Sequence, residues 1–350
     1  MNPKVRGINL AARARFRIAP WVVALAALAL ALAGAACGDD DDGGNGGELT
    51  KVTLMLDWTP NTNHAGIYIA KANGWYEDEG IDLEIIEPGQ TGVAQVVAAG
   101  QAEFGISVQE AVIPARAEGI PIVSIAAIIQ HNDSSFMSLA SEGISRPRDL
   151  AGKTYGGYGG QLETALLSQL VACDGGDPAT IRYVEVGNTN FLALLESNEF
   201  DFVWIFEGWD GVRAREVEKK EISTIRFRDH FDCIPDWYTP VIITSERMIE
   251  EQPEVVRAFM AATARGYEEA QKNAEASAEA LLEGAPELDE ALVRAAAAYH
   301  VGKYVDEGRQ WGLQDEEIWE EFVTFLVDAG LIAEPIDIAS AYTNEFLPEE

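Results

Sequence analysis

The chain alternates short apolar runs with longer segments in which apolar residues recur every three or four positions, from Lys51 to about residue 246. The first pattern predicts strands and the second predicts helices. The predicted strands span residues 51–56, 82–86, 104–107, 121–127, 153–156, 181–186, 201–205, 223–227 and 240–244. The predicted helices span residues 64–79, 91–100, 109–118, 161–172, 188–197 and 209–218. This alternation predicts an α/β fold in which crossover helices join parallel strands.

Beyond about residue 246 the pattern becomes helical throughout. Helix starts are expected at Gln252-Pro253, Leu288-Asp289 and Gln314-Asp315, because Pro at the first helical position and Asp just before it are common start signals.

Two segments mark boundaries between lobes. Residues 141–160 (SEGISRPRDLAGKTYGGYGG) are rich in Pro and Gly and lead into a new strand–loop–helix unit, and residues 234–240 (IPDWYTP) place two prolines around an aromatic pair. We therefore expect a second lobe, residues 141–239, inserted into a discontinuous first lobe of residues 50–140 and 240–350. Two α/β lobes joined by two crossings form a clamp, and the ligand is expected between them, outside the carboxyl ends of the strands.

Polar and aromatic side chains gather where the predicted strands end. The stretch LDWTPNTNHAG is the clearest example, because acid, indole, amide and imidazole groups follow one apolar strand. Over the whole chain the candidate ligand-binding residues are Asp57, Trp58, Asn61, His64, Gln109, Tyr155, Glu207, Trp237 and Tyr238. Together they suit a flat heteroaromatic ring with an amino group, which can stack on indole or phenol rings and donate to a carboxylate.

Several of these residues also have a structural explanation. Trp58 is compatible with a core position, Asp57 with a helix cap or turn, and His64 with a structural histidine. The glycine-rich loop YGGYGG resembles a phosphate cradle, but no Lys/Ser pair and no GxGxxG spacing accompany it, which disfavours a nucleotide site. Glu207 directly follows the apolar run VWIF, where an unpaired acid is costly, and this favours a functional role.

The N-terminus predicts export. Five basic residues and no acids precede an apolar run that ends in Gly34-Ala35-Ala36-Cys37. We expect residues 1–36 to be a lipoprotein signal peptide, Cys37 to be the lipidation site, and residues 37–49 to be a flexible acidic and glycine-rich tether. An uncleaved membrane anchor is the alternative, and both interpretations place the rest of the chain outside the cytoplasm.

Charge and cysteine content narrow the possible partners. The net charge of −33 becomes −38 when residues 1–36, with five of the 25 basic residues and none of the 58 acidic ones, are removed. Such a surface repels nucleic acid, which we exclude as a partner. Cys173 and Cys233 then remain, and both a disulfide and two free thiols are open possibilities. No metal-binding or nucleophile motif is recognised, so no cofactor and no metal are expected.

The stretch LDWTPNTNHAGIYIAKANGWYEDEGIDLEIIEPG resembles the opening of the thiamine-pyrimidine family of periplasmic-type binding proteins. The resemblance continues through DLAGKTYG, FEGW, PDWYTPV, PEVVRAFMAA and SAYTNEFL, and covers most of residues 50–347. The family includes formylaminopyrimidine-binding and riboflavin-type components of ABC importers and fungal hydroxymethylpyrimidine phosphate synthases. It implies a two-lobed periplasmic binding protein fold of type II, with Asp57, Trp58, Asn61, His64, Glu207 and Tyr238 contacting a pyrimidine.

The resemblance implies that the synthases of this family need reactive side chains that this chain lacks. They carry a lysine that binds pyridoxal phosphate where this chain has Ser107, and a histidine that is consumed where it has Ala111. They also carry a cysteine cluster near residues 234–238, where this chain has only the neighbouring Cys233. Hydroxyl and methyl groups cannot replace an imine-forming amine and an imidazole, so the resemblance implies a binding protein and not an enzyme.

We therefore predict a monomeric, lipid-anchored, extracytoplasmic solute receptor that captures an aminopyrimidine precursor of thiamine and delivers it to an ABC permease in the membrane. A receptor for riboflavin or another heterocycle is the alternative within the same fold. A synthase-like enzyme and a surface adhesin with an unused cleft are the alternatives from other classes.

Overall fold

The computed structural model describes residues 48–186 and 191–349. The predicted signal peptide, the lipidation site at Cys37 and the tether up to residue 47 lie outside the described residues. Within the described part of the chain, no helix is long and apolar enough to cross a membrane.

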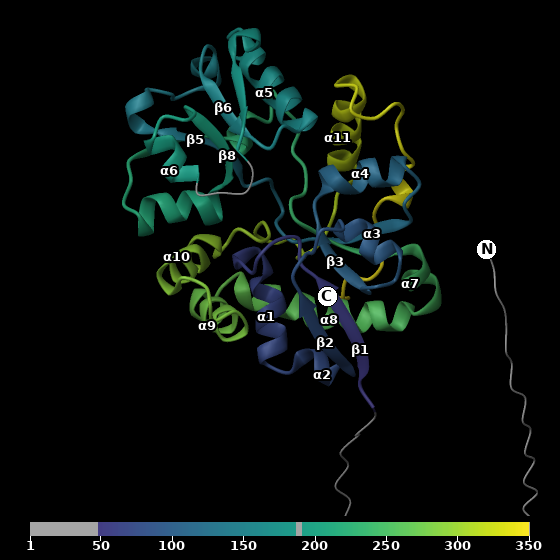
Figure 1. Ribbon diagram of the computed structural model, residues 1–350. Coiled ribbons are helices and arrows are strands. Elements are labelled where there is room, and N and C mark those ends of the chain that lie inside the picture. Colours follow the sequence, from purple (N-terminus) through teal and green to yellow (C-terminus); the bar gives the residue numbers. More distant parts are fainter. Residues whose placement is uncertain (1–47, 187–190, 350) are drawn as a thin grey trace, which may run out of the picture. The chain divides into compact units, whose positions relative to one another are not determined.

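The first sheet has the strand order β2-β1-β3-β10-β4. Its strands are β1 (Thr50–Met55), β2 (Ile81–Ile86), β3 (Phe104–Ser107), β4 (Ile122–Ala127) and β10 (Val241–Ser245). Strand β1 is parallel to both β2 and β3, whereas β10 runs antiparallel to both β3 and β4. Helices α1 (Ala65–Ala72), α2 (Trp75–Asp78), α3 (Val93–Ala98) and α4 (Gln109–Ala117) connect these strands, and Figure 1 traces the arrangement.

The second sheet has the order β7-β6-β8-β5-β9. Its strands are β5 (Ser134–Leu139), β6 (Thr154–Gly157), β7 (Arg182–Glu185), β8 (Phe202–Phe206) and β9 (Ile222–Arg226). Here β5 is antiparallel to both β8 and β9. Helices α5 (Gln161–Cys173) and α6 (Phe191–Glu196) belong to this part of the chain, and two π-helical segments, η5 (Glu207–Gly211) and η6 (Arg213–Val217), follow β8. The expectation of parallel sheets therefore fails at two strands, because β10 in the first sheet and β5 in the second run antiparallel to their neighbours.

Among the strands of the described residues, β5 is the one that the hydrophobic pattern did not predict. Its sequence, SSFMSL, mixes three serines with three apolar residues without strict alternation, and Ser134, Ser135 and Ser138 are all buried between β8 and β9. Short runs with so many hydroxyls do not stand out from loops, although a central strand tolerates them when its backbone is fully paired. Because β5 pairs within the second sheet, we propose that the first crossing lies near residues 128–133, before the expected boundary at residue 140.

The helical tail follows the expected starts. It consists of α7 (Glu246–Glu251), α8 (Pro253–Ala270), α9 (Ala274–Gly284), α10 (Glu290–His300) and α11 (Glu316–Asp328). Pro253 opens α8, Asp289 caps α10 by accepting the Leu292 N–H at 2.8 Å, and Asp315 precedes α11. These three starts are confirmed.

Helix α1, which begins directly after the LDWTPNTNH stretch, is held against α8 by two glycines. A Cβ on Gly266 would lie 1.9 Å from the Gly66 carbonyl oxygen, and a Cβ on Gly66 would lie 2.4 Å from the ring of Tyr267. Only glycine permits this approach of the two helices. The phenol of Tyr267 then donates to the Asn63 carbonyl at 2.7 Å, which fixes the loop between β1 and α1.

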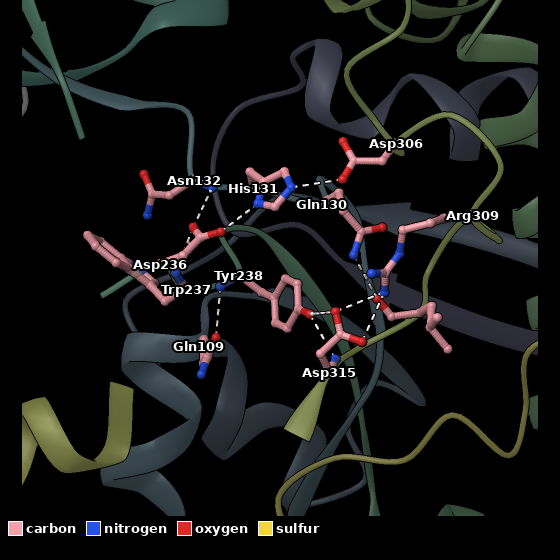
Figure 2. Close-up of polar contacts among 11 residues, drawn as sticks. Gln109, Gln130, His131, Asn132, Asp236, Trp237, Tyr238, Asp306, Arg309 and Asp315 are labelled. Atoms are coloured by element: carbon pink, nitrogen blue, oxygen red, sulfur yellow. Dashed lines mark hydrogen bonds and ion pairs between the residues drawn. The ribbon is translucent and has the colours of Figure 1, made fainter. Parts of the chain in front are cut away.

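The two crossings between the sheets are joined by a polar network (Figure 2). His131 lies between two carboxylates, with 2.6 Å from its Nδ1 to Asp236 and 2.9 Å from its Nε2 to Asp306. The other oxygen of Asp236 accepts the N–H groups of Asn132 and Trp237 at 3.0 and 2.9 Å. Asp236 therefore ties the first crossing to the second.

The second crossing is also tied to the second lobe by a disulfide. Cys173 at the end of α5 is bonded to Cys233, which settles the question that the sequence left open. The Cys233 carbonyl accepts a hydrogen bond from the Gln169 side chain at 2.6 Å. The crossing is thus anchored to α5 before it enters the first sheet as β10.

Candidate functional site

The candidate site is a cavity of about 470 Å³ lined by elements of both sheets. This volume lies within the usual range of small-molecule sites. The lining residues are Asp57, Trp58, Asn61, Asn63, Glu110, Tyr158, Leu162, Glu163, Phe191, Trp204, Ile205, Phe206, Trp209, Asp210, Thr239 and Pro240.

The loop between β1 and α1 supplies the polar edge of the cavity on the first-sheet side. Asn61 caps the short 3-10 helix η1 (Thr62–His64), its side-chain oxygen accepting the Asn63 N–H at 2.9 Å. His64 is fully buried behind this loop, and its Nδ1 accepts the Asn61 N–H at 3.2 Å. The neutral ring must then carry its proton on Nε2, which lies 2.8 Å from Asp57 and donates to it. His64 therefore positions the carboxylate of Asp57 and does not itself line the cavity.

Glu110, in the first turn of α4, adds a second carboxyl group to the same side. The indole N–H of Trp237 donates to it at 3.0 Å. Burial raises the pKa of Glu110 to about 8, the Trp237 hydrogen bond opposes this rise, and the charge of Asp57 adds to it. At neutral pH the protonated form of Glu110 is favoured, so this group can donate as well as accept a hydrogen bond.

The second-sheet side supplies most of the aromatic surface. Trp204 and Phe206 lie on β8, Trp209 lies on η5, and Tyr158 precedes α5. Trp204 also meets Trp237 edge to face, with 6.2 Å between the ring centroids, and this contact connects the second sheet to the indole that holds Glu110. Wide π-helical turns such as η5 are frequent at functional sites.

Two further carboxyl groups come from the second-sheet side. Asp210 lies on η5, where burial raises its pKa to about 6 and the charge of Arg213 opposes the rise. Glu163 lies in the first turn of α5. Four carboxyl groups and six aromatic rings thus line the cavity, and no Lys, Arg or His is among its described lining residues. This lining favours a planar ligand that donates hydrogen bonds or carries positive charge.

Only part of the predicted site lines this cavity. Asp57, Trp58 and Asn61 do so, and Trp58 is 38% exposed, as a side chain facing an open cavity can be. His64 and Trp237 stand behind the lining and hold Asp57 and Glu110.

The remaining predicted residues have other surroundings. Glu207 is buried and paired with Arg215 at 2.7 Å, so its charge is already compensated. Tyr155 is buried against Phe136 and Phe202 in the core of the second lobe.

Gln109 and Tyr238 bond to each other, the Tyr238 N–H donating to the Gln109 side chain at 2.7 Å (Figure 2). The Tyr238 hydroxyl accepts the Asp315 N–H at 2.8 Å. These two residues stabilise the second crossing. Gln109 follows β3 and Tyr238 lies in the second crossing before β10, and the direction of both side chains depends on partners remote in sequence.

Several lining residues were not among the predicted set. Trp204 lies inside a strand two residues before Phe206, and residues two apart in a strand share a face of the sheet. This spacing was the sequence signal that could have identified Trp204. Asp210 and Trp209 follow the strand end as expected, but the acid chosen was Glu207, three residues earlier. Glu163 and Phe191 carried no sequence signal that distinguishes them from ordinary helix residues.

A second cavity of about 520 Å³ adjoins the first and shares Asp57 with it. It is lined by the loop of residues 88–92 and the start of α3, together with Ser107, Ala111 and Glu118. Among the described residues, no cluster of His, Cys, Asp and Glu is arranged to hold a metal ion.

The pair of mixed α/β sheets with a cavity lined by both defines a class of protein. The structure is similar to the alkanesulfonate-binding protein SsuA of Xanthomonas axonopodis pv. citri, with a TM-score of 0.64, 13% identity and coverage of 85% of this chain and 99% of the other. It is equally similar to the periplasmic aliphatic sulphonate-binding protein of Escherichia coli, with a TM-score of 0.64, 12% identity and coverage of 86% and 94%. The chain therefore has the periplasmic binding protein fold.

The sequence identifies the family within this class. The profile of the family described as "NMT1/THI5 like" matches residues 61–277, and the chain belongs to that family. It is 28% identical to the formylaminopyrimidine-binding protein of Halalkalibacterium halodurans, over 85% of this chain and 90% of the relative.

Two further relatives show how varied the names within this family are. The chain is 29% identical to the riboflavin-binding protein RibY of Chloroflexus aurantiacus, over 86% of this chain and 87% of the relative. It is 26% identical to a 4-amino-5-hydroxymethyl-2-methylpyrimidine phosphate synthase of Legionella pneumophila, over 86% and 93%.

Proposed function

We propose that this chain is the solute-binding component of an ABC importer and that it captures an aminopyrimidine precursor of thiamine, formylaminopyrimidine or hydroxymethylpyrimidine. The observation that carries the proposal is the cavity between the two sheets, with its carboxyl groups and aromatic rings. The relative named as a formylaminopyrimidine-binding protein supports the choice of ligand.

In this proposal the ring of the ligand stacks on the indoles and phenyl rings, each such contact being worth about 1–3 kcal/mol by analogy with base stacking. Its amino group and a protonated ring nitrogen donate to Asp57, which His64 holds in place at 2.8 Å. Glu110, whose pKa is raised, donates to or accepts from the next ring position. Closure of the lobes would remove water and strengthen these polar contacts.

A receptor for riboflavin is the second candidate. The relative named as a riboflavin-binding protein favours it, and so does the cavity volume of about 470 Å³, because a single pyrimidine ring fills only part of it. The adjoining cavity of about 520 Å³ offers further room beside Asp57.

The chemistry of the adjoining cavity favours binding over catalysis. Ser107 and Ala111 line it, where the family resemblance places the lysine and histidine of the synthases. The sulfur of Cys233 is bonded to Cys173 and is not a free thiol. A chain with these groups has no amine at that position to form an imine with pyridoxal phosphate.

We also propose an extracytoplasmic location, with the chain held at the membrane by a lipid on Cys37. The Cys173–Cys233 disulfide supports an oxidising compartment and is independent of the signal-peptide argument. A permease in the membrane would then receive the ligand.

Calorimetry on the full-length protein in detergent tests the proposal. Formylaminopyrimidine or hydroxymethylpyrimidine is expected to bind with a dissociation constant of about 1 µM or less, a free energy of roughly −8 kcal/mol. Riboflavin should bind weakly and compete for the same site. Tight binding of riboflavin with no heat from either pyrimidine would establish the second candidate, and no heat from any of the three compounds would refute both.

A further inference from the structure

The glycine-rich loop before α5 has the form of an anion cradle, but the chain fills it with its own carboxylate. The backbone N–H of Tyr158 donates to both oxygens of Glu163 at 3.1 Å, and the N–H of Gly160 donates to one of them at 3.2 Å. Backbone N–H groups at the start of a helix are the groups that otherwise bind a phosphate. Glu163 is nearly buried and lines the cavity, so it occupies the place an external anion would take.

The negative charge of the cavity also disfavours the binding of an external anion. Asp57 and Asp210 line it together with Glu163, and no basic side chain is among its described lining residues. Glu110 also lines it but adds little charge, because its raised pKa of about 8 favours the protonated form at neutral pH. Arg213 lines a neighbouring cavity of about 220 Å³ that shares Asp210 with the first, and its charge opposes the rise in the pKa of Asp210.

We infer that the cavity takes heterocycles without a phosphate and rejects their phosphate esters, and that Glu163 is the residue that determines this selectivity. The inference rests on the proposed function, that the cavity binds a planar heterocycle. A phosphate ester carries about −1.5 to −2 charges at pH 7. It would enter a space where the N–H donors that could receive it are occupied and the ionised side chains repel it.

The size of the effect follows from the repulsion. Two unit charges about 8 Å apart, at an effective dielectric constant of about 20, weaken binding by a factor of roughly 30. With Glu163 and at least one other carboxylate ionised, we expect the phosphate ester to bind at least about 100-fold more weakly than the parent heterocycle.

The test compares two matched pairs of ligands by calorimetry at pH 7.5 on the full-length protein in detergent. The pairs are hydroxymethylpyrimidine with its phosphate ester, and riboflavin with riboflavin 5′-phosphate. Glu163→Ala frees the two N–H groups and removes a charge, so the ratio of ester affinity to parent affinity should rise about tenfold or more. Glu163→Gln leaves an acceptor for the N–H groups and should give a smaller gain.

Glu185→Gln is the matched control. This exposed carboxylate lies against the same loop beside Gly159, but it does not line the cavity and accepts no N–H of the loop. Selectivity should therefore stay as in the wild type.

The outcomes separate the inference from the proposed function. A parent heterocycle that binds with an ester of similar affinity, or ester binding that neither Glu163 variant improves, overturns the inference and leaves the proposed function standing. If no parent heterocycle of either pair binds, the proposed function fails and the inference falls with it. A gain in ester affinity in Glu185→Gln as large as in Glu163→Gln would show a general charge effect and would overturn the role of Glu163. Thermal unfolding of each variant confirms that it is folded.

Discussion

Replacing Asp57 with Asn tests the central contact of the site with little change in shape. Asn has nearly the same volume, and its side-chain oxygen can still accept the hydrogen bond that His64 donates at 2.8 Å. The loop between β1 and α1, which is also held by the Asn61 cap and the Tyr267–Asn63 bond, should keep its conformation. The substitution therefore removes a negative charge from the cavity and leaves the loop in place.

The magnitude follows from the kind of hydrogen bond that is lost. A bond to an ionised group contributes about 1.5–3 kcal/mol and a neutral one about 0.5–1.5 kcal/mol, so the difference is about 1–1.5 kcal/mol for each bond. If the amino group and the protonated ring nitrogen both donate to Asp57, the loss is about 2–3 kcal/mol, which corresponds to a dissociation constant about 30- to 150-fold higher.

Calorimetry with the bound pyrimidine or flavin measures this change, and thermal unfolding without ligand serves as the check on folding. Asp82→Asn is the control, because Asp82 is an exposed residue on β2 outside both cavities. An Asp57→Asn protein that is folded and binds within threefold of the wild type would refute the reasoning, since Asp57 would then make no charged contact with the ligand.

Three further predictions concern charge and stability. Burial raises the pKa of Glu110 to about 8, so the folded state binds more protons than the unfolded state between about pH 4.5 and 8. The contribution of Glu110 to the free energy of unfolding is therefore lost as the pH rises through that window, by up to about 1.4 kcal/mol per pH unit. Urea unfolding at several pH values should show that Glu110→Gln flattens this decline, and an unchanged slope would contradict the assignment. The double substitution of Cys173 and Cys233 by Ser opens a loop with a sequence separation of 60 and should lower the free energy of unfolding by about 2–4 kcal/mol. The reduced wild-type protein should have the same free energy of unfolding as the double variant, and a loss below about 0.5 kcal/mol would contradict the prediction. Glu207→Gln should leave ligand affinity within twofold of the wild type while lowering the unfolding temperature, because Glu207 pairs with Arg215 and not with the ligand, and a large loss of affinity by calorimetry would return Glu207 to the site.

The ends of strands were the most reliable guide to the site. Asp57, Trp58 and Asn61 follow β1, and in an α/β sheet the carboxyl end of a strand is where a ligand meets the chain. Their position could be predicted from the sequence because the strand before them and the helix after them both have a clear hydrophobic periodicity. The same reasoning located the segment after β8 but selected Glu207, which turns away to Arg215, over Asp210, which lines the cavity.

The helix η5 explains that difference. Residues three apart on an ordinary helix share a face, but η5 is π-helical, and which of its acids meets the cavity depends on the pitch of the helix and on what packs behind it. Arg215 is eight residues away from Glu207, on the following π-helical segment η6. A local sequence pattern cannot predict whether Glu207 or Asp210 faces the cavity when this depends on a partner such as Arg215.

From the sequence alone came the α/β class, the alternation of strands and helices, the helical tail, the family resemblance and the strand ends at which a site was sought. These depend on periodicity and on local start and stop signals, which act over a few residues. The tertiary structure decided that β5 and β10 enter their sheets antiparallel, that Cys173 meets Cys233, and that Glu163 closes the glycine-rich loop while Trp237 holds Glu110. Each of these is a pairing of groups whose energy depends on distance in space, and except for Glu163 the partners are far apart along the chain.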